Sequence, residues 1–434
     1  MKKLLTLVFA LALFLISCGS KKLDMPFTAS SHDFWYDGRL FFKNDSGYLA
    51  FRSIDGDGRI LCFDPLCTHT AEEGCPAVSG GSVPHLAVTA DENGNPVVFC
   101  ANIFRDINSG EMVPEIRQFD LADNKRTVLL SPAPDQIFGF WLYGQSIYFI
   151  TAVDAEKQTG TVIWKVKADG TGLRELARYE NRDSLSIVAV FEQQGKTMVI
   201  WGDYNDNQSL YLSPEDFSEE TKILEGVPLF QNFMLDGYLY FARRTDRTFP
   251  ALLIDGYVKD ERSSRDENGM VRARQERPEW EYARLALDDL FAEPELVVSG
   301  ILEPNAVWKP LYIAGNTAYV IPYDPQFLRV MTATMTGVIT GDIVEDSFAG
   351  EKTEFSYIVS DSGEKILAID LETGASRTLA TPGFDAEAII GMEDGTLILS
   401  GTVTDENRIR EDLDENGVRS LDFMFSDYLF LPVE

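Results

Sequence analysis

The chain repeats one short pattern of polar and apolar residues. A turn centred on glycine is followed at once by a run of β-branched or aromatic residues, which is typical of a β-hairpin. Seven copies occur: Tyr36-Asp37-Gly38 before RLFF, Asp91 to Gly94 before NPVVFC, Tyr143-Gly144 before QSIYFI, Gln194-Gly195 before KTMVIW, Asp236-Gly237 before YLYFA, Ala314-Gly315 before NTAYVI, and Asp394-Gly395 before TLILS. The glycine spacings of 56, 50, 51, 42, 78 and 80 residues suit repeated four-stranded units with two long insertions.

A second hairpin follows in most copies. Examples are IRQFDLADNKRTVLL from Ile116, IWKVKADGTGLRELA from Ile163 and ILAIDLETGASRTLA from Ile366. Two hairpins make one four-stranded blade, and sustained 3.6-residue periodicity is almost absent. We therefore expect an all-β fold, a single β-propeller over residues 32–434 with seven four-stranded blades, six or eight being the alternatives. The C-terminal run 427–434 is expected to pair with the first repeat and close the ring.

Two segments interrupt the repeat. A cysteine-rich insertion spans residues 61–85, and a long loop spans residues 244–281. The long loop combines Phe249, Tyr257 and Trp280 with Arg272, Arg274 and Arg277 in an otherwise acidic protein. Long loops between blades often carry recognition, so this loop is either a ligand-contacting surface or a solvated connection.

Two stretches resemble known sequences. The run IYFITAVDAEKQTGTVIWKVKADGTG from Ile147 resembles the YWTD-type blade of low-density-lipoprotein-receptor propellers. The run LCFDPLCTHTAEEGCPA from Leu61 is similar to a first-blade extension in uncharacterised lipoproteins of anaerobic Firmicutes. The resemblance implies a propeller fold and attachment to the cell membrane, and it carries no known activity.

The N-terminus has the organisation of an export signal. Lys2 and Lys3 precede an apolar run from Leu4 to Ile16, and Leu15-Ile16-Ser17-Cys18 resembles the bacterial lipobox. Thirteen residues would span about 20 Å as a helix, too short for a stable membrane span. We expect a signal peptide at 1–17, lipid such as palmitate on Cys18, a flexible tether at 18–31, and location on the extracytoplasmic face of the cell membrane.

The charge of the chain narrows its partners. The formal net charge is -31, and the apolar content of 45% is ample for a packed core. Nucleic acids and anionic lipid surfaces require basic protein surface, so neither is expected as a partner. We expect a monomer that contacts the membrane through its lipid and binds an unknown protein, peptide or glycan.

Four cysteines beyond the lipobox and one histidine form a candidate site: Cys62, Cys67, His69, Cys75 and Cys100. An even number of cysteines in an exported chain favours two disulfides, such as Cys67 to Cys75. The same residues could supply a Cys₃His site for structural zinc, with Cys100 or His85 as substitute ligands, or remain buried free thiols.

A weaker signal concerns calcium. Asp55, Asp57 and Asp64 partly match the spacing of an EF-hand loop, with Gly58 at its sixth position. The alternative is that Asp-Gly pairs here are simply the turn residues of hairpins. Structural zinc or calcium are thus the candidate cofactors, and no other cofactor is expected.

No catalytic residues can be nominated. The chain has three histidines, His32, His69 and His85, all in its first fifth, and it has no Gly-x-Ser-x-Gly motif or phosphate-binding loop. We therefore expect a lipid-anchored propeller that acts as a binding or scaffold module. The alternative is a carbohydrate-active enzyme, a glycosidase or lyase, that uses a pair of carboxylates at the channel mouth.

Overall fold

The computed structural model describes most residues between 23 and 433. The longer gaps in that range are 54–57, 70–74, 106–110, 253–274, 302–310, 323–327, 345–351, 361–364, 404–409 and 414–418, with shorter gaps between them. Cys18 and the expected signal peptide at 1–17 lie outside the described residues. All regular structure in the described part of the chain is β-strand. Among these residues no helix is long and apolar enough to cross a membrane.

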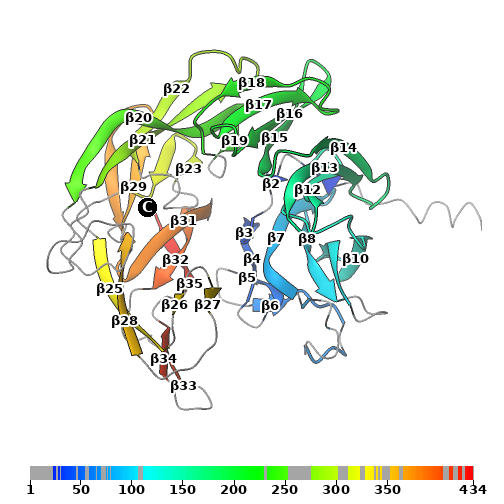
Figure 1. Cartoon of the computed structure of the whole chain (residues 1–434), viewed down its shortest axis with the longest axis horizontal. Helices are drawn as coiled ribbons and strands as arrows, with labels where there is room; N and C mark the ends of the chain where they lie inside the picture. Colours follow the sequence, from blue (N-terminus) through cyan, green and yellow to red (C-terminus); the bar gives the residue numbers. More distant parts are fainter. Residues whose placement is uncertain are drawn as a thin grey trace, which may run out of the picture. The chain divides into compact units, whose positions relative to one another are not determined.

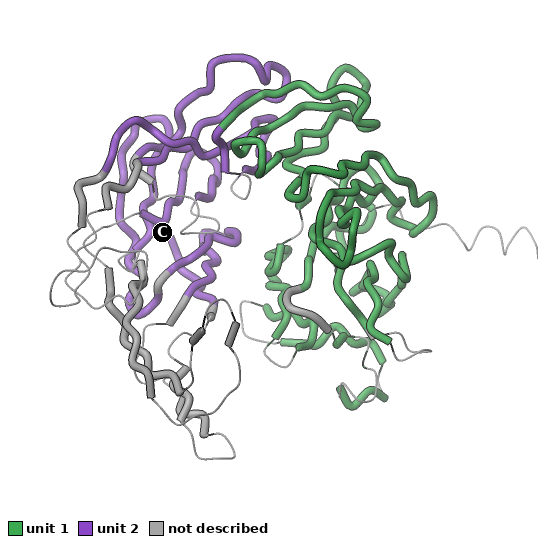
Figure 2. Tube along the Cα trace, viewed as in Figure 1, with its two compact units in different colours: residues 1–225 green, residues 226–434 purple. Residues whose placement is uncertain are grey.

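The chain divides into two compact units, residues 1–225 and 226–434 (Figure 2). Unit 1 contains four antiparallel sheets, which we call blades 1–4. Blade 1 has strands β3 (Phe34–Tyr36), β4 (Arg39–Lys43), β5 (Leu49–Ser53) and β6 (Gly58–Ile60). Blade 2 has β7 (Gly80–Asp91), β8 (Pro96–Arg105), β9 (Met112–Asp120) and β10 (Lys125–Leu130). Blade 3 has β11 (Gly139–Tyr143), β12 (Ser146–Asp154), β13 (Thr159–Lys167) and β14 (Arg174–Tyr179). Blade 4 has β15 (Leu185–Gln193), β16 (Lys196–Asp203), β17 (Ser209–Pro214) and β18 (Thr221–Leu224).

Unit 2 contains three further blades (Figure 1). Blade 5 has β19 (Phe233–Leu235), β20 (Tyr238–Leu252), β21 (Gln275–Ala286) and β22 (Glu295–Ile301). Blade 6 has β23 (Leu311–Ala314), β24 (Thr317–Val320), β29 (Lys365–Asp370) and β30 (Ser376–Ala380). Blade 7 has three strands among the described residues, β31 (Phe384–Glu393), β32 (Thr396–Val403) and β35 (Ser426–Pro432). Separate hairpins are β25 (Leu328–Thr336) with β28 (Lys352–Ser360), β26 (Ile339–Thr340) with β27 (Ile343–Val344), and β33 (Arg410–Leu413) with β34 (Arg419–Asp422).

The predicted fold class, an all-β propeller with seven blades, is confirmed. Each of the seven glycine-centred turns joins the first two strands of one blade. Positive φ angles occur where tight turns need them, for example 47° at Asp37 with 71° at Gly38, and 51° at Gln194 with 75° at Gly195.

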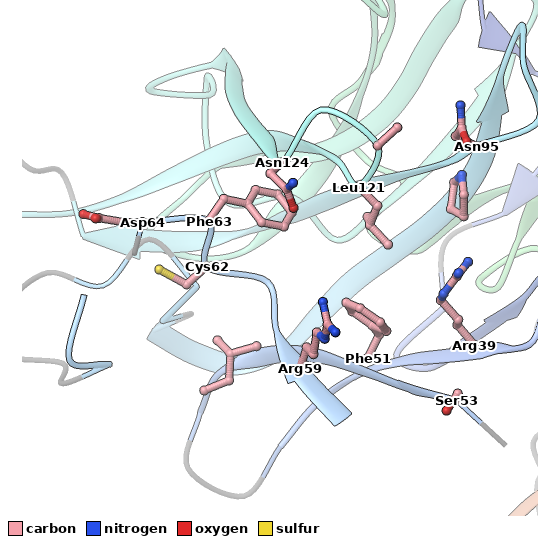
Figure 3. Close-up of a pocket in the computed structure, with 13 residues that line it drawn as sticks. Arg39, Phe51, Ser53, Arg59, Cys62, Phe63, Asp64, Asn95, Leu121 and Asn124 are labelled. Atoms are coloured by element: carbon pink, nitrogen blue, oxygen red, sulfur yellow. The ribbon is translucent and has the colours of Figure 1, made fainter. Parts of the chain in front are cut away.

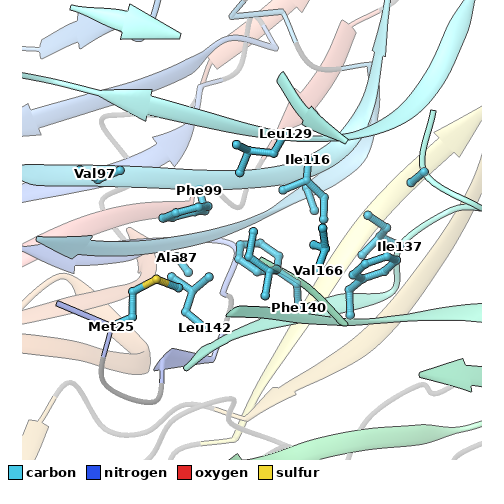
Figure 4. Packing of buried hydrophobic residues seen from close by; sticks show 14 of the residues in the cluster. Met25, Ala87, Val97, Phe99, Ile116, Leu129, Ile137, Phe140, Leu142 and Val166 are labelled. Atoms are coloured by element: carbon cyan, nitrogen blue, oxygen red, sulfur yellow. The ribbon is translucent and has the colours of Figure 1, made fainter. Parts of the chain in front are cut away.

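The hydrophobic core of each unit lies between consecutive blades. Between blades 2 and 3, Phe99 and Ile116 face Phe140 and Val166, and all four side chains are fully buried (Figure 4). Similar clusters join blades 1 and 2, 3 and 4, 5 and 6, and 6 and 7. Burying one such side chain contributes roughly 1.5–3 kcal/mol, so the blades stabilise one another through these shared layers.

The segment expected to be a flexible tether, residues 18–31, is strand-paired at two points. Strand β1 (Leu23–Asp24) pairs with β7, and β2 (Thr28–Ala29) pairs with β11, which extends blades 2 and 3 to five strands. Met25 is 5% exposed and packs in the cluster between these blades. The physical reason for this correction is the burial of Leu23 and Met25, which holds the segment against blades 2 and 3.

Two other expectations also change. The C-terminal strand β35 pairs with β32 of its own blade and not with the first repeat, whose sheet has the order β3-β4-β5-β6. The described ends of the expected long loop at 244–281 are strand, because β20 runs to Leu252, β21 starts at Gln275 and the two strands pair. Tyr257, Arg272 and Arg274 of that segment lie outside the described residues.

Candidate functional site

Residues 61–77 of the cysteine-rich insertion begin and end beside the same strand of blade 1, whereas residues 80–85 of the expected insertion already belong to β7. The Leu61 N–H donates to the Leu49 carbonyl at 2.8 Å, and the Leu49 N–H donates to the Ala77 carbonyl at 2.9 Å. Tyr48 forms a further isolated bridge with Val78. Strand β5 therefore holds both ends of the insertion, which brings residues far apart in the loop close together.

Three thiols and one imidazole converge inside this insertion. One ligand atom from each of Cys62, Cys67, His69 and Cys75 lies within 4.8 Å of every other. Cys75 Sγ is 3.7 Å from His69 Nδ1, and the His69 backbone N–H donates to Cys67 Sγ at 3.4 Å. Cys75 is 4% exposed, while the other three residues are half-buried. The group of four is hereafter the Cys₃His cluster.

The backbone at His69 is held in an unusual conformation. Its φ of 59° lies in the left-handed region, which non-glycine residues adopt at a cost. The Tyr48 hydroxyl donates to the His69 carbonyl, and the two rings meet edge to face with centroids 6.4 Å apart. These contacts from blade 1 stabilise the turn that directs the imidazole toward the thiols.

The electrostatic setting of the thiols opposes their ionisation. Burial raises the pKa of Cys75 to about 12, and the neighbouring thiols contribute to this increase. Burial also raises the pKa of Cys62. A nucleophilic cysteine needs a stabilised thiolate, so the cluster by itself is poorly suited to covalent catalysis.

Cys100 does not belong to the group. It lies in β8, is fully buried and packs in the apolar cluster with Phe41, Leu86 and Phe119. Burial raises its pKa strongly. Cys62, Cys67, Cys75 and Cys100 are all free thiols in this structure, so the two expected disulfides are not formed in it. His85, the substitute ligand, faces the ring of His32 at a centroid distance of 5.8 Å.

Only part of the predicted calcium site lies within the described residues. Asp55 and Asp57 lie outside the described residues. Asp64 is exposed, and its Oδ1 accepts a hydrogen bond from the Leu66 N–H at 2.9 Å. Asp64 thus caps a local turn, and the calcium site stays a prediction.

A cavity of ≈ 550 Å³ lies beside the Cys₃His cluster, between blades 1 and 2. Its lining is Arg39, Phe51, Ser53, Arg59, Ile60, Cys62, Phe63, Asp64, Asn95, Pro96, Leu121, Ala122 and Asn124. Figure 3 shows Arg39, Phe51 and Arg59 extending from blade 1 toward Leu121 on the turn between β9 and β10. We call this cavity the arginine pocket.

Strand register explains why the two arginines share one face. Phe51 pairs with Arg59 across β5 and β6, and Ser53 pairs with Arg39 across β5 and β4. Phe51 and Ser53 are two residues apart, so their side chains point to the same side of the sheet. Arg39 also donates to Asp37 at 3.3 Å, in an exposed pair that water screens.

Sequence reasoning did not find this pocket. Arg39 and Arg59 are 20 residues apart, and no motif connects them. The available signal was the alternation Arg39, Phe41 in one strand and Phe51, Ser53 in the next, which places an arginine among inward-facing apolar positions.

A second cavity of ≈ 540 Å³ lies between blades 2 and 3. Among the described residues, its lining has three carboxylates, from Asp120, Asp123 and Asp169, and no aromatic ring. Asp120 accepts from the Asp123 N–H at 3.0 Å, and Asp169 accepts from the Thr171 N–H at 2.9 Å. The Thr171 hydrogen bonds lower the pKa of Asp169, whereas a general acid requires a raised one.

Comparison with known proteins does not assign the chain to a family. No protein-family model and no curated protein match the chain. The chain is similar to an oligogalacturonate lyase solved in complex with manganese, at 9% identity and a TM-score of 0.47 over 95% of this chain and 97% of that one. It is similar to the polysaccharide lyase Uly1 at 9% identity and a TM-score of 0.41, over 93% and 89% of the two chains. A Mycobacterium tuberculosis puromycin-hydrolyzing peptidase gives 12% identity and a TM-score of 0.40, over 93% of this chain and 50% of that chain. At these identities and TM-scores, none of the three assigns an activity or a ligand to this chain.

Proposed function

We propose that the protein is a ligand-binding propeller, held on the extracytoplasmic face of the cell membrane by a lipid on Cys18, which binds an acidic sugar in the arginine pocket. The observation that carries the proposal is the placement of two guanidinium groups on either side of Phe51 in a protein of net charge -31. Guanidinium groups bind planar carboxylates with paired hydrogen bonds, and such bonds are stronger than neutral ones.

The rest of the lining suits a sugar better than a simple anion. The rings of Phe51 and Phe63 offer apolar surface to a sugar face, and Ser53, Asn95 and Asn124 offer donors and acceptors for hydroxyl groups. Among the described residues, the charged lining groups are Arg39, Arg59 and Asp64, which sum to +1. One carboxylate on the bound sugar would balance that charge.

Binding is favoured over the alternative of a carbohydrate-active enzyme. Acid and base catalysis on a glycosidic bond needs two carboxylates about 5–9.5 Å apart in a cleft that binds sugar. Among the described residues, Asp64 supplies one carboxylate to the lining of the arginine pocket. In the second cavity, Asp120 and Asp169 cap turns, and none of the described lining residues is aromatic.

Calorimetry with matched ligands tests the binding proposal. We expect the full chain in detergent to bind oligosaccharides that contain glucuronic acid, and to bind the corresponding glucose oligomers far more weakly. Arg59→Gln and Arg39→Gln should each weaken binding by about tenfold or more, because a charge-assisted hydrogen bond is lost. Arg178→Gln is the matched control, since Arg178 is exposed on β14 and pairs with Glu175 of the same strand. Equal loss in Arg59→Gln and Arg178→Gln, or no binding of any acidic oligosaccharide, would refute the proposal.

The anchor is tested separately. Full-length protein made in a bacterial host should incorporate labelled palmitate and sediment with membranes, and Cys18→Ser should lose the label. Palmitate incorporation that persists in Cys18→Ser would place the lipid elsewhere and reject Cys18 as its site.

A further inference from the structure

We propose that the Cys₃His cluster is a structural zinc site, in which Cys62, Cys67 and Cys75 supply thiolates and His69 supplies the imidazole nitrogen. The four ligand atoms come from one insertion of blade 1 and gather in one place without any disulfide. The inference is independent of the arginine pocket and does not require any ligand to bind there.

The distances match a tetrahedral ion. With zinc–sulfur bonds of about 2.3 Å, the edge of a tetrahedron is about 3.8 Å. Cys75 Sγ and His69 Nδ1 are 3.7 Å apart, and no pair of the four ligand atoms exceeds 4.8 Å. An ion at the centre therefore needs only small rotations of side chains that are already turned toward one another.

The composition of the cluster selects the metal. Three soft thiolates and one imidazole favour zinc over calcium or magnesium, which prefer oxygen ligands. Four protein ligands fill a tetrahedral shell and leave no position for water or substrate, which is the arrangement of structural and not catalytic zinc. Binding of Zn²⁺ would displace three thiol protons to solvent and leave the site with a net charge of -1.

The insertion needs a cross-link because it has little core of its own. Leu61 and Ala77 are buried at its two ends, but Leu66 between them is 88% exposed. The described residues from 61 to 77 form turns and irregular backbone, with no strand among them. A long irregular segment of this kind loses much conformational entropy on folding, and a metal ion can offset that loss.

Zinc would also shape one wall of the arginine pocket. Cys62 belongs to the cluster and lines the pocket, and Phe63 and Asp64 follow it directly along the same wall (Figure 3). Fixing Cys62 by coordination therefore fixes the path of the next two residues.

Metal analysis of the purified full chain tests the proposal without any ligand. We expect one zinc per chain by mass spectrometry of the metal content. Replacement by Co²⁺ should give the intense visible absorption of a tetrahedral thiolate site. Cys75→Ser and His69→Gln should each lower zinc affinity at least tenfold. The control Cys100→Ala also removes one thiol, but it should retain one equivalent of zinc, because Cys100 packs in the core.

Three results would overturn the proposal. The first is wild-type protein that binds neither zinc nor cobalt under reducing conditions. The second is a non-reduced mass that shows a disulfide between two of the three cluster cysteines in protein that was never exposed to oxidant. The third is an unchanged cobalt spectrum in Cys75→Ser. Because the first and second use wild-type protein, a variant that fails to fold does not remove the test.

Discussion

Arg117 and Glu115 form a buried ion pair on strand β9, with 2.7 Å between Arg117 Nε and Glu115 Oε2 and 4% of each side chain exposed. The two residues are two positions apart, so they lie on the same face of blade 2. The Ser131 hydroxyl donates to Glu115 Oε1 at 2.5 Å, and the Arg117 guanidinium lies 3.8 Å from the centre of the Phe104 ring. Burial lowers the pKa of Arg117, and the charge of Glu115 opposes that effect.

Replacing one partner of this ion pair should destabilise the protein more than replacing both partners with apolar residues. We expect Glu115→Gln to lower the free energy of unfolding by about 3–5 kcal/mol, because it leaves the Arg117 charge buried without its counter-ion. The double variant Glu115→Leu with Arg117→Met should be more stable than Glu115→Gln, since no charge remains buried. Urea denaturation measures both. A double variant less stable than Glu115→Gln would contradict this account, and Glu175→Gln at the exposed pair with Arg178 should change little.

Gly170 lies where blade 3 approaches blade 2 too closely for a side chain. A Cβ atom at this position would be 2.3 Å from the Leu129 carbonyl oxygen, and the φ of Gly170 is 81°. We expect Gly170→Ala to destabilise the protein by more than the roughly 1–2 kcal/mol that a positive φ alone costs. Gly195→Ala is the matched control, because Gly195 has a φ of 75° and nothing within 4 Å of its Cβ position. Thermal denaturation that shows equal losses for the two variants would mean that the close contact with Leu129 has no energetic role.

The seven turns were predictable because their chemistry is local. A tight turn needs positive φ angles, and a glycine such as Gly38 or Gly195 supplies one within the two or three residues of the turn itself. The pairing of Leu23 with Asp91 is different, because β1 has two residues and no periodicity, and its partner is distant in sequence. The C-terminal strand showed the same limit: its apolar pattern predicts a strand, but it does not choose between β32 and a strand of the first repeat.

The candidate sites divide in a similar way. Spacing alone singled out Cys62, Cys67, His69 and Cys75, but their convergence depends on the return of the insertion to Leu49. Spacing also did not show that Cys100 lies apart from these four residues. Its position in the core follows from the pairing of β7 with β8. The arginine pocket was missed because Arg39 and Arg59 share a face only through the register of three strands.

Glu215 follows β17 of blade 4 and contacts side chains of blade 3. It should make the stability of the protein depend on pH below 4.5, the ordinary pKa of a glutamate side chain. It accepts hydrogen bonds from Lys165 Nζ at 2.5 Å, from Arg174 Nη2 at 2.9 Å, and from the Tyr148 hydroxyl. Burial alone would raise the pKa of Glu215, but the bonds from Lys165 and Tyr148 outweigh it and lower the pKa below 4.5. The folded state therefore holds the proton less tightly than the unfolded chain. The resulting stability is present above 4.5 and is lost as the pH falls through the folded pKa.

The substitution Glu215→Gln isolates this contribution. We expect the variant to be less stable than wild type at pH 7, and the difference between them to shrink as the pH falls below about 4.5. Urea midpoints measured at a series of pH values give both curves. A stability difference that stays constant down to the acid unfolding limit would show that Glu215 acts through packing and not through its charge.

His85 should make the stability of the protein depend on pH in a higher range, between 6.5 and about 4. Burial lowers the pKa of His85 from 6.5 to about 4, and the His32 ring facing it adds to the effect. The unfolded chain therefore binds the proton more tightly than the folded protein. Stability from this residue is complete above pH 6.5, falls as the pH decreases toward 4, and the loss by pH 4 is about 3 kcal/mol.

His85→Leu removes the titrating group and places an apolar side chain of similar size at the same half-buried position. We expect its unfolding free energy to change less than that of wild type between pH 6.5 and 4, so the two curves converge or cross as the pH falls. His32→Gln is the matched control, and because burial is the main cause of the shift, this variant should keep most of the wild-type slope. Proton NMR of the wild-type imidazole gives a direct check. A measured pKa near 6.5, or parallel stability curves for wild type and His85→Leu, would show that the folded protein accommodates the charged ring.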